Sequence, residues 1–367
     1  MNDNKWRIWF AVFVGMCLIA AVYFIGKLPG RPVEVDGGYR EIMGTFARVV
    51  AVADNTRQAR ACIEAGFAEL RRIDSVMSDY KTDSELGKVN REAFGKAVKV
   101  SPELFWILQK SSEFSRLSNG AFDITVGPLV DLWHKAGEAN AMPDENALAE
   151  AKARVGYEKL ILDANAQTVQ FAVEGMRLDL GGIAKGYAVD KAVVAMQRCG
   201  AIGGMVDSGG NIRCFGKPTN KDVWLVGLQN PQAVDANSVL PQLQAVGSDQ
   251  VLMVLKLNDM AVATSGGYRR FVTVDGRRFS HIIDTNTATS ANKLASDTII
   301  ARTAIDADAL STAVNVLGPE KGLALIESLP DVEAILITAE PQYRVVKSDE
   351  ADAYLQSHSP PRRTHDE

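Results

Sequence analysis

The sequence predicts an α+β fold in which helices flank a mixed or antiparallel sheet. Strand-like and helix-like segments alternate irregularly from Tyr39 onward, unlike the regular strand–helix alternation of a parallel sheet. Asp275-Gly276 stands between two strand-like runs and is a strong signal for an antiparallel hairpin. No block of sequence recurs at a fixed period, which argues against a solenoid or a propeller.

Local patterns define the expected elements in order. Apolar residues follow one helical stripe over 57–77, and Gly200 and Gly318 are placed to end two later helices. Glycines interrupt the strand-like run 205–215. We expect helices at 57–77, 102–117, 184–199 and 306–317, and strands at 44–52, 205–215, 223–229, 270–274, 278–283, 297–302 and 332–338.

Composition restricts function only weakly. A chain of 367 residues with 47% hydrophobic residues can bury a substantial core. The net charge of -5 predicts no basic face, so nucleic-acid binding is disfavoured. Because no linker-like composition interrupts the middle of the chain, we expect one domain over 31–350 and a polar C-terminal tail over 351–367.

The cysteines and histidines are scattered. Cys17, Cys62, Cys199 and Cys214 form no C-x-x-C pair, which disfavours a zinc ribbon or a haem-attachment site. Buried thiols are expected, with a Cys199–Cys214 disulfide as an open alternative. Among the histidines, only His281 lies in an informative setting.

The N-terminus has the pattern of a membrane anchor. Lys5 and Arg7 precede an apolar run over 8–25, and about 18 such residues can cross a bilayer as a helix. The preceding positive charges should stay cytoplasmic, so we expect a transmembrane helix within 1–30 in a bacterial inner membrane, with the remaining chain in the periplasm. An uncleaved anchor is favoured over a cleaved signal peptide, since no small-residue cleavage site follows the run.

Three glycine pairs point to a ligand cleft. The segment 178–190 passes through Gly181-Gly182 into a predicted helix, where backbone groups can approach a ligand and free N–H groups can bind phosphate. Lys185 is not followed by Ser or Thr, so this is not a Walker loop. With Gly209-Gly210 and Gly266-Gly267, the pattern suggests a cleft for an extended, phosphate-bearing molecule, although tight turns or β-bulges would also account for each pair.

Oxygen-bearing side chains share one face of the helix predicted at 306–317. Asp308 and Thr312 are four residues apart, and oxygen ligands suit a hard cation that bridges to phosphates. Asp306 is then expected to cap the helix. The alternative is that both aspartates only cap the helix and favour its dipole.

Two aromatic motifs complete the set. Phe122-Asp123 lies between glycines in 120–127, and Tyr80 follows the first long helix. Tyr80, at the helix end, could stack on a planar ring or belong to the core.

Taken in order, these motifs resemble the ApbE family, the FAD:protein FMN transferases. The resemblance covers about residues 40–340. It is carried by the motifs at 43–45, 77–80, 120–123, 179–188, 207–211, 264–266, 281–284 and 308–312.

The resemblance implies a set of site residues and a fold of T-fold-like sheets. The residues implied to contact FAD are Met43, Tyr80, Ala121, Phe122, Asp123, Asp179, Lys185 and Ile282, with Tyr80 near the flavin. The implied Mg²⁺ ligands are Asp308, Thr312 and a backbone carbonyl in the turn from Gly182 to Ala184. The sequence departs from the family after Asp284, where Thr285 to Thr289 replace the usual proline and glycine, so the shape of this loop stays open.

The expected reaction is Mg²⁺-dependent transfer of FMN from FAD to a Thr or Ser hydroxyl of a target protein, with release of AMP. His281 is the candidate base, or alternatively a strand residue that positions Asp284. Lys185 would offset pyrophosphate charge, or else be a solvated helix residue. The resemblance implies a subunit of a respiratory electron-transfer complex as the acceptor. The alternatives are an FAD pyrophosphatase and a non-catalytic flavin-binding protein at the membrane.

Overall fold

The computed structural model describes residues 31–233, 250–266, 271–339, 341 and 343–356, together with 9, 10, 13 and 16. The helices of the domain are α2 (Thr56–Met77), α3 (Glu85–Glu92), α4 (Pro102–Leu117), α5 (Gly127–Ala139), α6 (Glu145–Ala153), α7 (Ala184–Arg198), α8 (Ala304–Leu317) and α9 (Pro319–Glu327), with short 3-10 helices η1 (Tyr157–Lys159) and η3 (Ala351–Tyr354).

The strands follow the same chain order. They are β1 (Val33–Ile42), β2 (Thr45–Ala53), β3 (Val98–Lys99), β4 (Leu160–Asp163), β5 (Thr168–Phe171), β6 (Gly203–Ser208), β7 (Asn211–Phe215), β8 (Trp224–Gln229), β9 (Val251–Leu257), β10 (Ala261–Gly266), β11 (Phe271–Val274), β12 (Arg277–Ser280), β13 (Ile283–Asp284), β14 (Thr289–Ser290), β15 (Leu294–Ala301), β16 (Glu333–Thr338) and β17 (Val345–Lys347).

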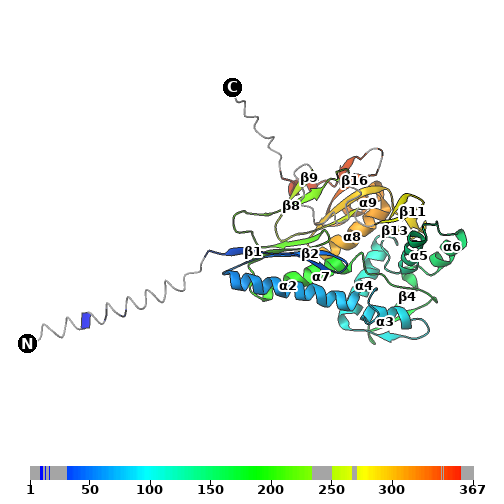
Figure 1. The fold of residues 1–367 in the computed structure, drawn as a ribbon, viewed down its shortest axis with the longest axis horizontal. Coiled ribbons are helices and arrows are strands. Elements are labelled where there is room, and N and C mark those ends of the chain that lie inside the picture. The colour runs from blue at the N-terminus through cyan, green and yellow to red at the C-terminus, as the bar shows by residue number, and fades with distance from the viewer. Residues whose placement is uncertain are drawn as a thin grey trace, which may run out of the picture.

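An eight-stranded sheet forms the centre of the molecule, in the order β1-β2-β6-β7-β10-β15-β16-β17 (Figure 1). All neighbouring strands within it pair antiparallel. The predicted hairpin forms as β11 and β12, which turn through Asp275 and Gly276. The α+β prediction with antiparallel sheets is therefore confirmed.

Three helices cover one face of this sheet. Helix α2 packs on β1, β2 and α7, while α8 packs on β10 and β15 (Figure 1). The predicted stripe of α2 is confirmed: it is buried at Cys62, Ile63, Phe67, Leu70, Ile73 and Met77. The opposite face of the sheet packs against the β8–β9 hairpin and η3 through a second apolar cluster that includes Trp224 and Leu255.

A smaller apolar cluster joins α5 and α6 to the β11–β12 and β13–β14 hairpins at one end of the molecule (Figure 1). The indole of Trp133 lies 4.7 Å from the ring of Phe279, centroid to centroid. It also donates a hydrogen bond to the carbonyl oxygen of Ala288 at 2.9 Å. These contacts hold the loop after β13 against α5.

Several sequence predictions need correction. The N-cap of α8 is Thr303, not Asp306: the Thr303 hydroxyl accepts from the Asp306 backbone N–H and donates to its carboxylate. Beyond the expected boundary at 350, η3 continues the ordered chain, and Ala351 is fully buried. Cys199 and Cys214 are free thiols rather than a disulfide.

The predicted membrane anchor at 1–30 lies almost wholly outside the described residues. Within the part of the chain that the structure describes, no helix combines the length and the apolar character needed to span a membrane. The sequence motif Gly266-Gly267 is likewise described only at Gly266.

Candidate active site

One cleft of about 960 Å³ receives every predicted site residue. This volume is at the upper end of the range for small-molecule sites, about 300–1,000 Å³. Its walls come from the β1–β2 turn, the end of α2, the first turns of α7 and α8, and loops between. The predicted residues that line it are Met43, Tyr80, Ala121, Phe122, Asp123, Asp179, Gly182, Ala184, Lys185, His281, Ile282, Asp308 and Thr312.

Gly182 in the turn before α7 and Gly186 in the first turn of α7 allow α7 and α8 to touch. A methyl group on Gly182 would lie 2.8 Å from the hydroxyl oxygen of Thr312, and one on Gly186 would lie 2.2 Å from the carbonyl oxygen of Ala304. The Asp179 carboxylate holds the turn by accepting from the Gly181 N–H at 2.7 Å. These glycines therefore bring the backbone of the turn directly against the oxygen-bearing face of α8.

An oxygen atom of this turn and one of α8 both contact the ammonium of Lys185. The Asp308 carboxylate, 4% exposed, accepts from the Gly186 N–H at 2.9 Å and lies 3.5 Å from Lys185 Nζ. Lys185 also donates to the carbonyl oxygen of Gly181. An ammonium held by a carboxylate and a carbonyl shows that this donor set attracts positive charge.

Neighbouring oxygen atoms, which share only Asp308 with the atoms around Lys185, fit Mg²⁺, because this ion prefers oxygen ligands and keeps several waters. Asp308, Thr312 and a carbonyl of the 182–184 turn would hold the ion, with Lys185 sharing the carboxylate. In the chain as described, no three His, Cys, Asp or Glu side chains converge on one point. A cation here would therefore depend on one carboxylate supplemented by neutral oxygens.

An apolar and aromatic part of the cleft wall adjoins the oxygen cluster, since a methyl group on Gly182 would lie 3.2 Å from the Phe122 ring. Ala121, Phe122 and Ile282 are buried, whereas Tyr80 is 72% exposed. Asp123 is buried beside them, and burial raises its pKa, although hydrogen bonds oppose the shift. Those bonds come from the Thr125 N–H and hydroxyl and from the Tyr157 N–H, at 2.7 to 2.9 Å. Asp123 thus also fixes the shape of this wall.

The sequence did not predict His134, which lies on α5 and lines the same cleft as the predicted His281. Both histidines are exposed. Helix α5 begins at Gly127-Pro128 without a side-chain cap, so no local signal placed His134 near the site.

Asp79 is a second missed residue of the cleft. Burial and the neighbouring charge of Asp179 raise the pKa of Asp79 to about 6, against the opposing effect of Arg177. Arg177 Nη2 lies 2.7 Å from the Asp79 carboxylate and also pairs with Asp131. The motif at 77–80 contained Asp79, but its partner Arg177 is too distant in sequence to be foreseen.

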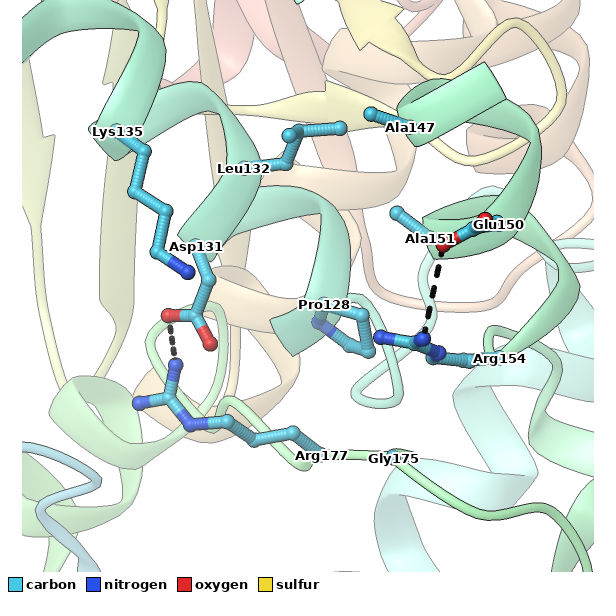
Figure 2. A pocket seen from close by; sticks show the side chains of 10 residues that line it. All are labelled: Pro128, Asp131, Leu132, Lys135, Ala147, Glu150, Ala151, Arg154, Gly175 and Arg177. Carbon is cyan, nitrogen blue, oxygen red and sulfur yellow. Dashed lines mark hydrogen bonds and ion pairs between the residues drawn. The ribbon is translucent and has the colours of Figure 1, made fainter. Parts of the chain in front are cut away.

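Asp131 and Arg177 line a smaller pocket of about 240 Å³ between α5, α6 and the segment before the glycine turn (Figure 2). Figure 2 shows the ion pair between them, and a looser one between Glu150 and Arg154 at 3.9 Å. Arg177 therefore joins the wall of this pocket to the wall of the larger cleft.

The loop that departs from the family pattern keeps a defined shape. The Thr285 hydroxyl donates to the carbonyl oxygen of Gly120 at 3.2 Å, and Thr285 lines the cleft. Ala288 takes the left-handed conformation, with φ of 59°, and its carbonyl accepts from Trp133.

Comparison with known families finds one family over most of the chain. The sequence model of the ApbE family matches residues 43–336 of the chain. The chain belongs to the ApbE family. The match spans the cleft from the β1–β2 turn to beyond α8, so the ApbE region includes every residue of the site described above.

Relatives of this ApbE chain cover most of its length. It is 32% identical over 353 residues to the FAD:protein FMN transferase of Treponema pallidum, covering 92% of this chain and 93% of the relative. It is 34% identical over 295 residues to that of Haemophilus influenzae, covering 78% and 81%.

Solved structures share the fold. The ApbE protein of Thermotoga maritima superposes with a TM-score of 0.76 at 29% identity, covering 89% of this chain and all of that one. The Pseudomonas stutzeri flavinyl transferase ApbE, in its apo form, gives 0.74 at 26% identity, covering 90% and 99%.

Proposed function

We propose that this ApbE-family enzyme transfers FMN from FAD to a Thr or Ser hydroxyl of a target protein, forming a phosphoester bond and releasing AMP. The observation that carries the proposal is one cleft in which an apolar, aromatic wall adjoins an oxygen cluster. This cluster already contacts the ammonium of Lys185. The first suits a flavin ring and the second a pyrophosphate with its counter-ion.

In the proposed reaction, the oxygen of the acceptor hydroxyl attacks the FMN phosphorus. A new oxygen–phosphorus bond forms, and the bond from that phosphorus to the AMP oxygen breaks. Mg²⁺, when bound, supplies positive charge beside the pyrophosphate. Lys185 adds a second positive charge there, and the turn at exposed Gly181 and half-buried Gly182 offers backbone groups to the substrate.

The hydroxyl proton passes to a ring nitrogen of His281, which is exposed in the cleft. Replacement by alanine should lower turnover by at least about 100-fold, the usual minimum for general base catalysis. A loss below about tenfold would instead favour a positioning role for His281.

The metal assignment is tested with a matched pair on α8. Asp308→Asn keeps an acceptor for the Gly186 N–H but removes the charge, so Mg²⁺-dependent AMP release from FAD should disappear. Asp306 lies in the same helical turn but does not line the cleft, so the Asp306→Asn variant should retain AMP release. Wild-type turnover by the Asp308 variant would refute the metal assignment.

Transfer is distinguished from hydrolysis by the fate of FMN. The probe is FAD with Mg²⁺ and a flavin-accepting protein domain that carries one target threonine. Covalent flavin fluorescence on a denaturing gel, with the added mass of FMN by mass spectrometry, is expected. AMP and free FMN without labelled acceptor would indicate an FAD pyrophosphatase, and no AMP at all would indicate a non-catalytic flavin-binding protein.

We also propose that residues 1–30 anchor the enzyme in a bacterial inner membrane with the cleft in the periplasm, where flavin-bearing subunits of respiratory complexes are the natural acceptors. The support is the charge and apolar pattern around 8–25. Protease added to spheroplasts should digest the domain, and retention of the intact domain would contradict this orientation.

A further inference from the structure

Lys185 occupies one oxygen of the carboxylate on which the proposed cation site depends. The two oxygens of Asp308 have different partners: Oδ2 accepts from the Gly186 N–H at 2.9 Å, and Oδ1 lies 3.5 Å from Lys185 Nζ. Asp308 is buried, so water has little access to it. A cation that binds Asp308 must therefore share this carboxylate with Lys185.

Of these two partners, only Lys185 can leave Asp308 without moving a helix. The Gly186 N–H belongs to the backbone of α7, and a methyl group on Gly186 would lie 2.2 Å from the Ala304 carbonyl oxygen of α8, so the two helices are in direct contact here. Lys185 reaches Asp308 through a long, flexible side chain that is 24% exposed. The ammonium is thus the exchangeable partner of the carboxylate.

Charge balance makes this exchange depend on the substrate. Asp308 balances the charge of Lys185 alone, and the other ligands proposed for Mg²⁺ are neutral oxygens, so Mg²⁺ beside Lys185 would leave an excess of positive charge. Asp79, another acid of the cleft, is already paired with Arg177. Each phosphorus of the FAD pyrophosphate carries an ionised oxygen, so a bound pyrophosphate would supply the missing negative charge.

We propose that Lys185 is an internal counter-ion of the cation site, which binds Asp308 in the free enzyme and moves to the pyrophosphate when FAD binds. The affinity for Mg²⁺ is then low before FAD binds and rises with it, so the two ligands bind cooperatively. The inference rests on the proposed use of FAD and Mg²⁺. It gives Lys185 control over metal binding, in addition to the neutralisation of pyrophosphate charge.

The decisive measurement is the affinity of the FAD-free enzyme for Mg²⁺, by isothermal titration calorimetry. Lys185→Met removes the competing charge and keeps most of the length of the side chain, so Mg²⁺ should bind about tenfold more tightly than to the wild type. A lysine that serves only the pyrophosphate would leave this affinity unchanged. Unchanged, weaker or unmeasurable Mg²⁺ binding by the variant would overturn the inference.

Two further variants control for charge and for position, and thermal unfolding checks that each variant is folded. Lys185→Arg keeps the positive charge, so its Mg²⁺ affinity should stay within about twofold of the wild type. Lys81→Met removes a lysine that also lines the cleft but pairs with Asp74 at 2.6 Å, and it should stay within the same range of about twofold. A gain equal to that of Lys185→Met in either control would contradict competition by Lys185 at Asp308.

The same titrations with saturating FAD, and without an acceptor protein, test the release of Lys185. FAD should tighten Mg²⁺ binding to the wild type about tenfold, and Mg²⁺ should tighten FAD binding, followed by flavin fluorescence quenching, by the same factor. With FAD bound, Lys185 has left Asp308, so the gain of Lys185→Met should shrink to within about twofold. A gain of the same size with and without FAD would rule out the release.

The failure of this inference can be told apart from that of the proposed function. A wild-type protein that binds no FAD would refute the proposed function. Tighter Mg²⁺ binding by the FAD-free Lys185→Met variant would still show the competition at Asp308.

Discussion

At the scale of single residues, Asp297 is the buried acid whose pKa is shifted furthest from its ordinary value. It is fully buried, and burial raises its pKa from 3.8 to about 7, although hydrogen bonds from Ser311 and Asn315 oppose the shift. A carboxyl group in this position holds its proton far more tightly in the folded chain than in the unfolded one. Folding stability must therefore depend on pH through this residue.

The sign of that dependence is fixed by linkage. Below about pH 4 both states are protonated, and Asp297 carries no penalty. Between about pH 4 and pH 7 the unfolded chain loses the proton while the folded chain keeps it, so the free energy of unfolding falls as pH rises, by at most about 4 kcal/mol. Asp297→Asn should abolish this fall. In urea unfolding, the free energy of unfolding of the variant relative to the wild type should therefore be higher at pH 8 than at pH 5. Parallel curves for both proteins would contradict it.

Met43 carries backbone strain in the wall of the cleft. It and Gly44 both have positive φ, 56° and 63°, in the two-residue turn between β1 and β2, where Asn-Gly is the favoured pair. A non-glycine residue in the left-handed region costs about 1–2 kcal/mol. Such strain is common at functional sites, and Met43 also packs against the core.

We therefore expect Met43→Asn to change the free energy of unfolding by less than about 1 kcal/mol, since relief of strain offsets the lost apolar contact. Its FAD affinity should fall about tenfold, the effect of about 1.4 kcal/mol of lost contact. Asp275→Asn is the control, because Asp275-Gly276 is another two-residue turn with positive φ but lies outside the cleft. Equal FAD affinity in both variants would exclude a binding role for Met43.

At the scale of elements, the contact between α7 and α8 decides the geometry of the proposed cation site. Gly186→Ala would place a methyl group 2.2 Å from the Ala304 carbonyl oxygen and 2.8 Å from the Asp308 Cβ. Both neighbours belong to α8, so the helices must separate, at a cost of about 1–3 kcal/mol. The midpoint temperature of thermal unfolding and the affinity for Mg²⁺ should both decrease. In Gly227→Ala the methyl group meets only ordinary contacts with Val251 at 3.5 Å, and stability should stay within about 0.5 kcal/mol.

The predictability of an element followed the strength of its own pattern. The helix expected at 102–117 forms over Pro102–Leu117, with Ser101 capping it through the Leu104 N–H. In contrast, β1 was not predicted, because it alternates half-buried and exposed residues at the edge of the sheet and contains Gly37-Gly38. Short helices such as α3 and α6 bury few side chains, so tertiary contacts rather than periodicity determine them.

At the scale of the whole molecule, the C-terminal segment closes the second apolar cluster. Ala351 is fully buried, and the Gln356 N–H donates to the Val254 carbonyl oxygen of β9 at 2.9 Å. A chain ending at residue 350 should lose about 2 kcal/mol or more of unfolding free energy, as expected for removal of buried core contacts. A chain ending at 356 should match the full-length protein in thermal unfolding, and equal stability of the two truncations would contradict this role.

The motifs that line the cleft were more predictable than the side-chain contacts that support them. Motifs such as the Gly181-Gly182 turn and the Asp308–Thr312 pair are local, so their residue types reveal them. Asp79 with Arg177, and Ser265 with Ser311 and Asp297, depend on side chains brought together from distant segments. Burial and long-range hydrogen bonding have no signature in a single sequence, and these were the features that only the fold could supply.

The cleft is bounded at one end of the chain by Met43 and at the other by Thr312. A partly synthesised chain that lacks α8 has no complete binding site, so coenzyme affinity appears only when nearly the whole domain has folded. Once it has, FAD at 100 times its dissociation constant would stabilise the native state by about 2.7 kcal/mol. Coenzyme supply would thereby influence how long this protein survives proteolysis, independently of its role in the reaction.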